Sequence, residues 1–489
     1  MKKKGLLSRV LIIILIMSFV FTMTGSAQST TKALSTNYTV VNMGIALANV
    51  NATYYKTDGS AWPADADKTN FTVDSNFGQK VIAQYFDSTM VPGQGSAVLS
   101  SDQPLGAVVT IQARGQVATN GAYVGYSSGS EKFYVPLIAR NRNTANGLTN
   151  TQIIIQNLNN TAMSAKVDFV ALPGLGFSDW TKTPINIPAY SSYYYDIEEE
   201  LPSNLPDGWI GSAQVASNDS GKQIAVVFNI FSGANGLQTV NAFPAEKTSL
   251  TWSVPQFVSR IPNGLSTPIN IQNISGGNIA AGGIDVDCVP ATGYVGNVHI
   301  ENSAVIPNNA TFGVNPVTDM SITGNWQGAC KITSTGNIVA IVTLRRPGLD
   351  EISAYEAFPT SITDTKVIVP LMAKRLANGF ATVAVIQNLD QVNSATVRLT
   401  YTRAPGFTVG DPTYVINNVS IPPGGNVQQN LRLASEPVGT TMPDGWQGTL
   451  LVEAQPSTTA RPLVAYVALT NYYTTNGDTQ MAHDAFYLP

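Results

Sequence analysis

The side chains that catalysis or metal binding would need are sparse in this chain. His299 and His483 are the only histidines and lie far apart in the sequence, so a histidine metal site or an acid-base relay is not expected. The one Gly-x-Ser-x-Gly match, at residues 125–129, has no histidine near it in the sequence and no helical pattern after it, and no glycine-rich loop precedes a helical pattern. Paired carboxylates would suffice for glycoside hydrolysis, but that chemistry needs a cleft, and regular repeats give no sign of one. We therefore expect a protein that is not an enzyme.

Two groups of carboxylates are candidates for Ca²⁺, which prefers oxygen ligands. They are Asp58, Asp65 and Asp67 in one loop, and Asp196, Glu198, Glu199 and Glu200 after three consecutive tyrosines. Neither group has a calcium-loop pattern. We interpret both as solvated loop charge and expect no cofactor.

The N-terminus has the order of a secretory signal: basic residues up to Arg9, an apolar run over residues 10–21, then Gly25 and Ala27 before the expected cleavage. Residues 1–27 are thus a predicted signal peptide, and Gln28 the expected mature start. The alternative is a retained anchor, although the run is shorter than the ~20 residues a span needs. The expected location is secreted or extracellular, in association with the cell surface, without a membrane span after cleavage.

Removing four basic residues with the leader leaves 23 basic against 31 acidic residues, a net charge of −8. Binding to nucleic acid is not expected, because it needs a basic surface. The low charged fraction and abundant β-branched residues predict a β-rich chain.

Two markers recur with a period of about 116 residues. One is an Asn that closes an apolar strand, and the other is a Gly early in a later strand. The positions are Asn42, Asn157, Asn273 and Asn388, and Gly95, Gly211, Gly328 and Gly448. A third marker is Val-Pro at residues 135–136, 254–255 and 369–370, which indicates a repeat boundary.

Each repeat is expected to contain seven short strands. Residues 395–402 alternate, with Val397, Leu399 and Tyr401 on one face and polar residues on the other. The prediction is an all-β chain of four tandem seven-stranded immunoglobulin-like β-sandwiches. The expected domains are residues 28–132, 133–250, 251–365 and 366–489.

The only two cysteines, Cys288 and Cys330, belong to the third repeat and share parity with apolar neighbours. Both thiols should point into one core, so a disulfide is expected in an oxidising compartment. The alternative is a pair of buried free thiols.

Trp209, Trp326 and Trp446 each precede the repeated Gly by two residues. They could stack on sugars, but their parity favours a place in the core. Basic residues also recur after each Val-Pro strand, at Arg140, Arg142, Arg260, Lys374 and Arg375, and a shared position at a domain junction would explain them.

The first repeat lacks a Val-Pro strand and has only residues 29–39 in its place. Either that segment supplies the opening strand or the first sandwich has an open edge. Residues 486–489, Phe-Tyr-Leu-Pro, nearly repeat residues 133–136, Phe-Tyr-Val-Pro, and were interpreted as the start of a further repeat.

The combination of Val-Pro-Leu, Gln-Asn-Leu, Asp-Gly-Trp-x-Gly and Ala-Phe-Pro resembles the tandem immunoglobulin-like repeats of exported bacterial surface proteins. The resemblance covers residues from about 37 to 489 and brings no catalytic residues with it. It implies a structural or interaction protein built as a rod, with a protein or glycan partner at the cell surface. Two alternatives stay open: a glycan-binding adhesin, and a self-assembling surface-layer or filament subunit that uses an open edge strand.

Overall fold

The computed structural model describes residues 34–113, 117–319, 321–322, 324–346, 348–455, 461–471 and 477–488. The predicted signal peptide lies outside the described residues. The described chain is all-β, and its sheets form tandem β-sandwiches, so the predicted fold class is confirmed. No helix in these ranges is long and apolar enough to cross a membrane.

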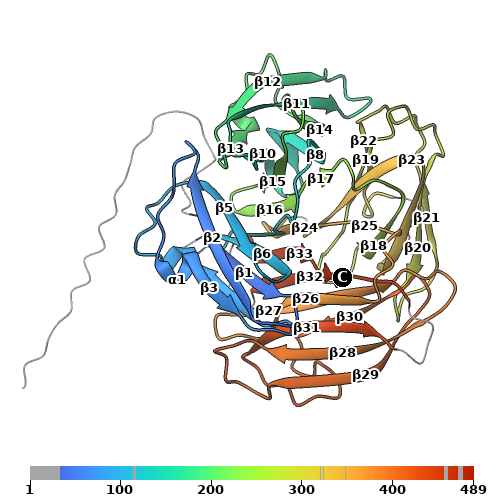
Figure 1. Cartoon of the computed structure of the whole chain (residues 1–489). Helices are drawn as coiled ribbons and strands as arrows, with labels where there is room; N and C mark the ends of the chain where they lie inside the picture. The colour runs from blue at the N-terminus through green and yellow to red at the C-terminus, as the bar shows by residue number, and fades with distance from the viewer. Residues whose placement is uncertain are drawn as a thin grey trace, which may run out of the picture. The chain divides into compact units, whose positions relative to one another are not determined.

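The fourth sandwich shows the repeat most clearly (orange to red in Figure 1). Its strands are β26 (Lys366–Lys374), β27 (Phe380–Asn388), β28 (Ala395–Arg403), β29 (Thr413–Ile421), β30 (Asn426–Asn430), β31 (Trp446–Ala454), β32 (Leu463–Asn471), β33 (Gln480–Asp484) and β34 (Phe486–Tyr487). One sheet has the order β29-β28-β31-β26-β34, and the other has the order β30-β27-β32-β33. The buried face of β28 carries Ala395, Val397, Leu399 and Tyr401, as its alternation predicts.

The second sandwich has the same strand order. It consists of β8 (Lys132–Arg140), β9 (Arg142–Thr144), β10 (Gly147–Asn157), β11 (Met163–Ala171), β12 (Trp180–Ile187), β13 (Ser192–Asp196), β14 (Trp209–Ser217), β15 (Ile224–Ser232), β16 (Gly236–Asn241) and β17 (Phe243–Pro244). Its sheets are β12-β11-β14-β8-β17 and β13-β10-β15-β16.

The third sandwich repeats this order. Its strands are β18 (Ser249–Ser259), β19 (Ile269–Asn273), β20 (Ile284–Pro290), β21 (Val298–Glu301), β22 (Thr311–Val314), β23 (Trp326–Arg345), β24 (Ile352–Glu356) and β25 (Phe358–Pro359). The long β23 serves both sheets, because its first half pairs with β18 and β20 and its second half with β19 and β24.

Without the strands of two or three residues, and with β23 counted once in each sheet, each of these sandwiches has eight strands where seven were expected. The additional strand is β16, β24 or β33, which adds an edge to the second sheet. In β33 every residue from Gln480 to His483 is buried, so no alternation marks it in the sequence.

The first sandwich lacks the opening strand in its described part. It consists of β1 (Leu34–Asn42), β2 (Ala48–Lys56), β3 (Asn70–Val73), β4 (Gln79–Ala83), β5 (Gly95–Ser101), β6 (Leu105–Ala113) and β7 (Asn120–Val124), with the short helices α1 (Ala66–Thr69) and η1 (Gln84–Phe86). Its sheets are β4-β1-β6-β7 and β3-β2-β5. Residues 34–39 belong to β1, which takes the place of β10 or β27, and residues 29–33 lie outside the described part. The described residues therefore leave β5 as an open edge.

The Val-Pro pairs do not form junctions between sandwiches, which corrects the boundary interpretation. Each lies within an opening strand, where the pairing with β14, β23 or β31 shifts register immediately after Val135, Val254 or Val369. Proline has no N–H to donate, so it is tolerated at such a bulge.

Phe486 and Tyr487 do not begin a further repeat either. They form β34, which pairs with the opening strand β26 as β17 pairs with β8 and β25 with β18. Their counterparts are thus Phe243–Pro244 and Phe358–Pro359, and the likeness to residues 133–136 is coincidental.

The four sandwiches contact one another in a closed cycle, which contradicts the expected rod. β7 contacts β16 and β33, and β24 contacts the same two strands. In a rod the first and fourth sandwiches would not meet, whereas here Asp478 N–H donates to Ala118 O at 2.8 Å. Residues 33–489 form one compact unit.

Candidate functional site

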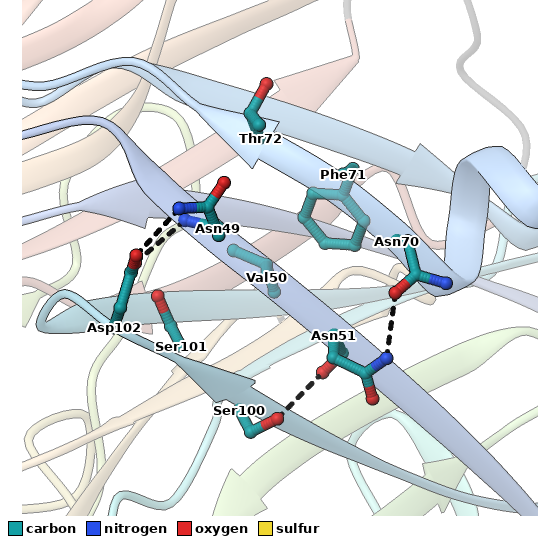
Figure 2. A pocket seen from close by; sticks show the side chains of 9 residues that line it. All are labelled: Asn49, Val50, Asn51, Asn70, Phe71, Thr72, Ser100, Ser101 and Asp102. Atoms are coloured by element: carbon teal, nitrogen blue, oxygen red, sulfur yellow. Dashed lines mark hydrogen bonds between the residues drawn. The ribbon is translucent and has the colours of Figure 1, made fainter.

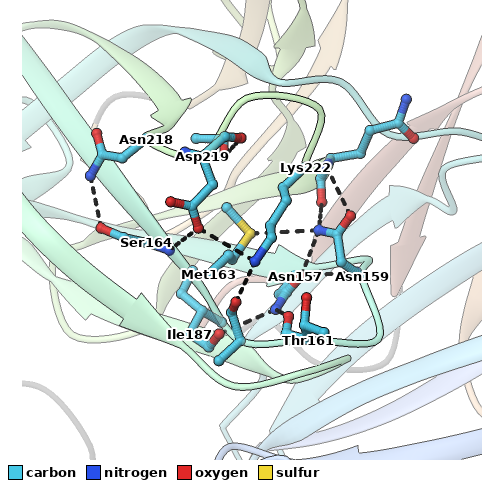
Figure 3. Close-up of polar contacts among 12 residues, drawn as sticks. Asn157, Asn159, Thr161, Met163, Ser164, Ile187, Asn218, Asp219 and Lys222 are labelled. Atoms are coloured by element: carbon cyan, nitrogen blue, oxygen red, sulfur yellow. Dashed lines mark hydrogen bonds and ion pairs between the residues drawn. The ribbon is translucent and has the colours of Figure 1, made fainter.

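The repeated asparagines are buried and their side chains hydrogen-bond to the backbone of neighbouring loops. Asn157 is fully buried, and its Nδ2 donates to the carbonyls of Thr161, Ile187 and Pro188 at 2.9–3.2 Å (Figure 3). Its Oδ1 accepts the N–H of Asn159 at 2.9 Å. The same amide contacts recur at Asn42, Asn273 and Asn388. This marker serves the fold, because it joins the end of one strand to the two that follow.

The repeated glycines and tryptophans form a second structural unit. A Cβ at Gly211 would overlap the carbonyl oxygen of Val170 and the ring of Trp209, and the same holds at Gly328 and Gly448. Trp209 is fully buried and its Nε1 donates to Ser178 O at 3.1 Å. Trp326 and Trp446 are buried as well, so none of these rings offers a surface for a sugar.

In the first sandwich another tryptophan covers the repeated glycine. Gly95 packs against Trp62, which comes from the connection between β2 and β3, and the Trp62 ring donates to Val91 O at 3.1 Å. No signal in the sequence repeat marks Trp62. Trp62 therefore covers the repeated glycine as Trp209, Trp326 and Trp446 do in the other sandwiches, but it comes from a different part of the chain.

The cysteines form the expected disulfide. Cys288 on β20 and Cys330 on β23 are directly opposite one another in the same sheet, and both are buried. The bridge of antibody domains instead joins the two sheets. The corresponding pairs elsewhere are Tyr54–Ala97, Phe169–Ala213 and Tyr401–Leu450, so the disulfide replaces a packing pair.

The basic residues after the opening strands hold loops of their own sandwich. Arg140 donates to Glu200 O at 2.7 Å, Arg260 to Ile322 O at 2.7 Å, and Lys374 to Met442 O at 2.7 Å. These contacts replace the expected role at a domain junction.

The candidate calcium ligands of the first sandwich are not brought together. Asp65 accepts from Thr89 Oγ1 at 2.6 Å and Ser88 N at 2.9 Å, and lies 3.2 Å from the Lys68 ammonium. These donors lower the pKa of the Asp65 carboxyl. A carboxylate already occupied by an ammonium and hydroxyl groups is a poor cation ligand, and Asp58 instead accepts from Ser60 N.

Only the last residue of the acidic run is buried, while Asp196 and Glu198 are half-buried and Glu199 is exposed. Glu200 is buried and accepts from Tyr195 Oη at 2.7 Å and Lys182 Nζ at 3.0 Å. These bonds outweigh the cost of burial and lower its pKa to about 2.

His299 joins a group that the sequence did not predict. One ligand atom each from Asp285, His299 and Glu301 lies within 4.8 Å of the others on β20 and β21. His299 Nδ1 is 2.7 Å from Asp287 Oδ1, and this bond raises the pKa of the imidazole. The group is exposed or half-buried, and cross-strand charge pairing accounts for its geometry.

A shallow hollow lies on the first sandwich (Figure 2). It measures about 640 Å³ and is lined by Asn49, Val50, Asn51, Asn70, Phe71, Thr72, Ser100, Ser101 and Asp102. Asn49 donates through its backbone N–H and its Nδ2 to the Asp102 carboxylate at 2.8 and 2.7 Å, and Asn51 Nδ2 donates to Asn70 Oδ1 at 2.9 Å. The Asn49 bonds lower the pKa of Asp102. The hollow offers amide, hydroxyl and carboxylate groups to a ligand.

Asp478 lies where the four sandwiches meet and is fully buried. Its carboxylate accepts the N–H groups of Leu237 at 2.8 Å, Gln480 at 3.1 Å and Ile352 at 3.3 Å. Its carbonyl oxygen accepts from Asn120 Nδ2 at 2.7 Å. Burial raises the pKa of this carboxyl well above its usual value, against the effect of the three N–H donors. No repeat marker pointed to Asp478.

No family model matches the chain, and no curated protein sequence shows a significant match to it.

Proposed function

We propose that the mature chain is a non-enzymatic, secreted or cell-surface protein that acts as a structural and interaction scaffold. The closed cycle of contacts around Asp478 carries the proposal, because its buried carboxylate accepts from the second, third and fourth sandwiches and its backbone carbonyl accepts from Asn120 of the first. Such a unit presents its outward loops and edges in fixed positions, which suits binding.

The roles of the residues that recur between the sandwiches support the same proposal. The repeated Asn, Gly and Trp residues and the cysteine pair all hold the sandwiches together. The first sandwich differs from the others in its open edge, and the hollow of Figure 2 lies on it, so we place the binding function there.

An epitope inserted between Gly174 and Leu175 tests the location. This turn is exposed and a side chain at Gly174 would contact nothing, so the insertion should not disturb the fold. We expect the tagged protein outside the cell, with an N-terminus near Gln28 in mass spectrometry. A cytoplasmic protein with an intact leader would overturn the proposal.

Glycan binding is a second candidate function, favoured by the polar hollow of Figure 2. Adjacent acceptor and donor groups suit the vicinal hydroxyl groups of a sugar. On a glycan array we expect a signal that Asp102→Asn abolishes and the exposed control Asp67→Asn retains. An array without a signal, or equal signals from both variants, would reject this candidate.

A further inference from the structure

The strand that begins at the repeated glycine has two neighbours in each later sandwich. β14 lies between β11 and β8, the first half of β23 between β20 and β18, and β31 between β28 and β26. In the first sandwich β5 takes this place, and within the described residues it pairs with β2 alone. The described part of this sheet therefore has one strand fewer than its counterparts in the other sandwiches.

The missing strand leaves core positions uncovered. Inward-facing Ala213 and Val215 on β14 are fully buried, and so are Leu450 and Val452 on β31. Their counterparts on β5 are Ala97, which is exposed, and Leu99, which is half-buried. Val98 between them is 37% exposed, and β5 carries no charged residue that would discourage pairing.

The second sandwich covers one end of this edge. Tyr194 Oη donates to Gly95 O at 2.8 Å, and Ser96 Oγ donates to Tyr190 O at 2.8 Å. Since Gly95 shares parity with Ala97 and Leu99, the backbone groups of those two residues also point to the open side. The free acceptor edge is thus residues 97–101.

The leader would not leave a strand in the mature chain to fill the gap. Subtracting the interval of 115 from the bounds of β8 places the opening strand at residues 17–25, inside the predicted signal peptide. After cleavage behind Ala27 only residues 28–33 would precede β1. These six residues match in number the six, 141–146, that connect β8 to β10.

We propose that the 97–101 edge of β5 accepts an extended strand from another polypeptide. This inference rests on the proposed interaction function and names its partner chemistry. The strands that fill the same place in the other sandwiches carry two inward apolar side chains around an outward residue, as in Phe133-Tyr134-Val135 and Trp252-Ser253-Val254. The partner has this pattern and runs antiparallel to β5.

Disulfide trapping tests the register. On β14, Gln214 faces Tyr134 and Ala216 faces Lys132, so Val98 should face position 134 of an added peptide and Ser100 position 132. The mature Val98→Cys chain is mixed with a peptide of residues 131–137 that carries Tyr134→Cys. The native cysteines are already paired, so the new thiol is the only one available.

We expect the Val98→Cys chain to cross-link at least about tenfold faster than the Ser100→Cys chain, whose position is also exposed, because strand register fixes the facing residue. A peptide that also carries Phe133→Lys and Val135→Lys should cross-link to the Val98→Cys chain at least about tenfold more slowly than the peptide without them. Its inward face is charged and cannot be buried. Circular dichroism of both chains confirms that they are folded.

Three outcomes would overturn the proposal. Equal rates for Val98→Cys and Ser100→Cys would show that no strand register exists. A disulfide-linked dimer of Val98→Cys chains that excludes the peptide would show that a second copy covers the edge. Failure of the folded mature Val98→Cys chain to react with the peptide, as monomer, would show that the chain covers its own edge. Loss of trapping with an extracellular mature protein would leave the scaffold function standing.

Discussion

The side chains that recur in every sandwich contact backbone groups of neighbouring loops. Asn157 uses both atoms of its amide in this way, and its counterparts do the same. Their spacing revealed the repeat, yet spacing alone does not distinguish a ligand-binding amide from one that fastens a loop. Burial makes that distinction, since none of the four amides is exposed to a ligand.

Asn157→Asp should lower the free energy of unfolding by about 3 kcal/mol, because a carboxylate cannot donate to the carbonyls of Thr161, Ile187 and Pro188. Urea denaturation followed by tryptophan fluorescence measures the change. Asn186→Asp, at an exposed position of β12, is the matched control and should change stability by less than about 0.5 kcal/mol. Equal effects would show that Asn157 has no special role.

The two histidines predict opposite responses to acid. Burial lowers the pKa of His483 to about 4, so the folded state resists its protonation. Its contribution is present above the unfolded value of 6.5 and is lost as the pH falls toward 4, by about 3 kcal/mol. The pKa of His299 is raised, so its contribution is present at low pH and is lost as the pH rises.

His483→Gln should therefore flatten the fall in stability between pH 6.5 and pH 4.5, whereas His299→Gln should not. Denaturation curves at several pH values for wild type and both variants provide the comparison. The raised pKa of the neighbouring Asp484 acts in all three proteins and cancels in the differences. An unchanged slope in His483→Gln would contradict the assignment.

At the scale of elements, sequence reasoning was most successful where one face of a strand is solvated. The alternation in β28 predicted its buried side chains, and the parity of Cys288 and Cys330 predicted the disulfide. It failed for β33, whose two faces are both covered because it lies at the contact between sandwiches. It placed Val-Pro in the opening strand but did not predict the bulge there, since a proline near an apolar run indicates a boundary and a bulge equally.

Gly328→Ala tests the close approach of strands that the repeated glycine permits. The new methyl group would overlap Val289 O and the Trp326 ring, and backbone on both sides limits relaxation. We expect a loss of about 3 kcal/mol in unfolding free energy. Gly277→Ala in the same sandwich meets no atom within 4 Å and should be nearly neutral. Similar losses in both variants would mean that chain flexibility, and not contact, explains the glycine.

At the scale of the whole described unit, the feature to explain is why the four sandwiches close on one another. The edge strands β7, β16, β24 and β33 meet. The carboxylate of Asp478 accepts N–H groups from the second, third and fourth sandwiches, and its backbone carbonyl accepts from Asn120 of the first. A buried carboxyl is costly to leave unpaired, so this site favours the single arrangement that satisfies all of its partners. That specificity would keep the open edge of β5 beside the second sandwich.

Asp478→Asn should weaken the cycle without removing the side chain. The amide NH₂ would replace an acceptor oxygen and face a backbone N–H, either that of Leu237 or those of Ile352 and Gln480. We expect a loss of about 1–3 kcal/mol and faster proteolysis between sandwiches, with each sandwich still folded. Limited proteolysis and small-angle scattering measure both effects, with Asp67→Asn as the exposed control.

The wild-type mature chain should give a radius of gyration of about 23 Å, the value for a compact chain of this length. A radius near 40 Å in the wild type, as a rod of four sandwiches would give, would contradict the closed cycle. An Asp478→Asn chain as resistant to protease as the control would show that the carboxylate does not hold the sandwiches together.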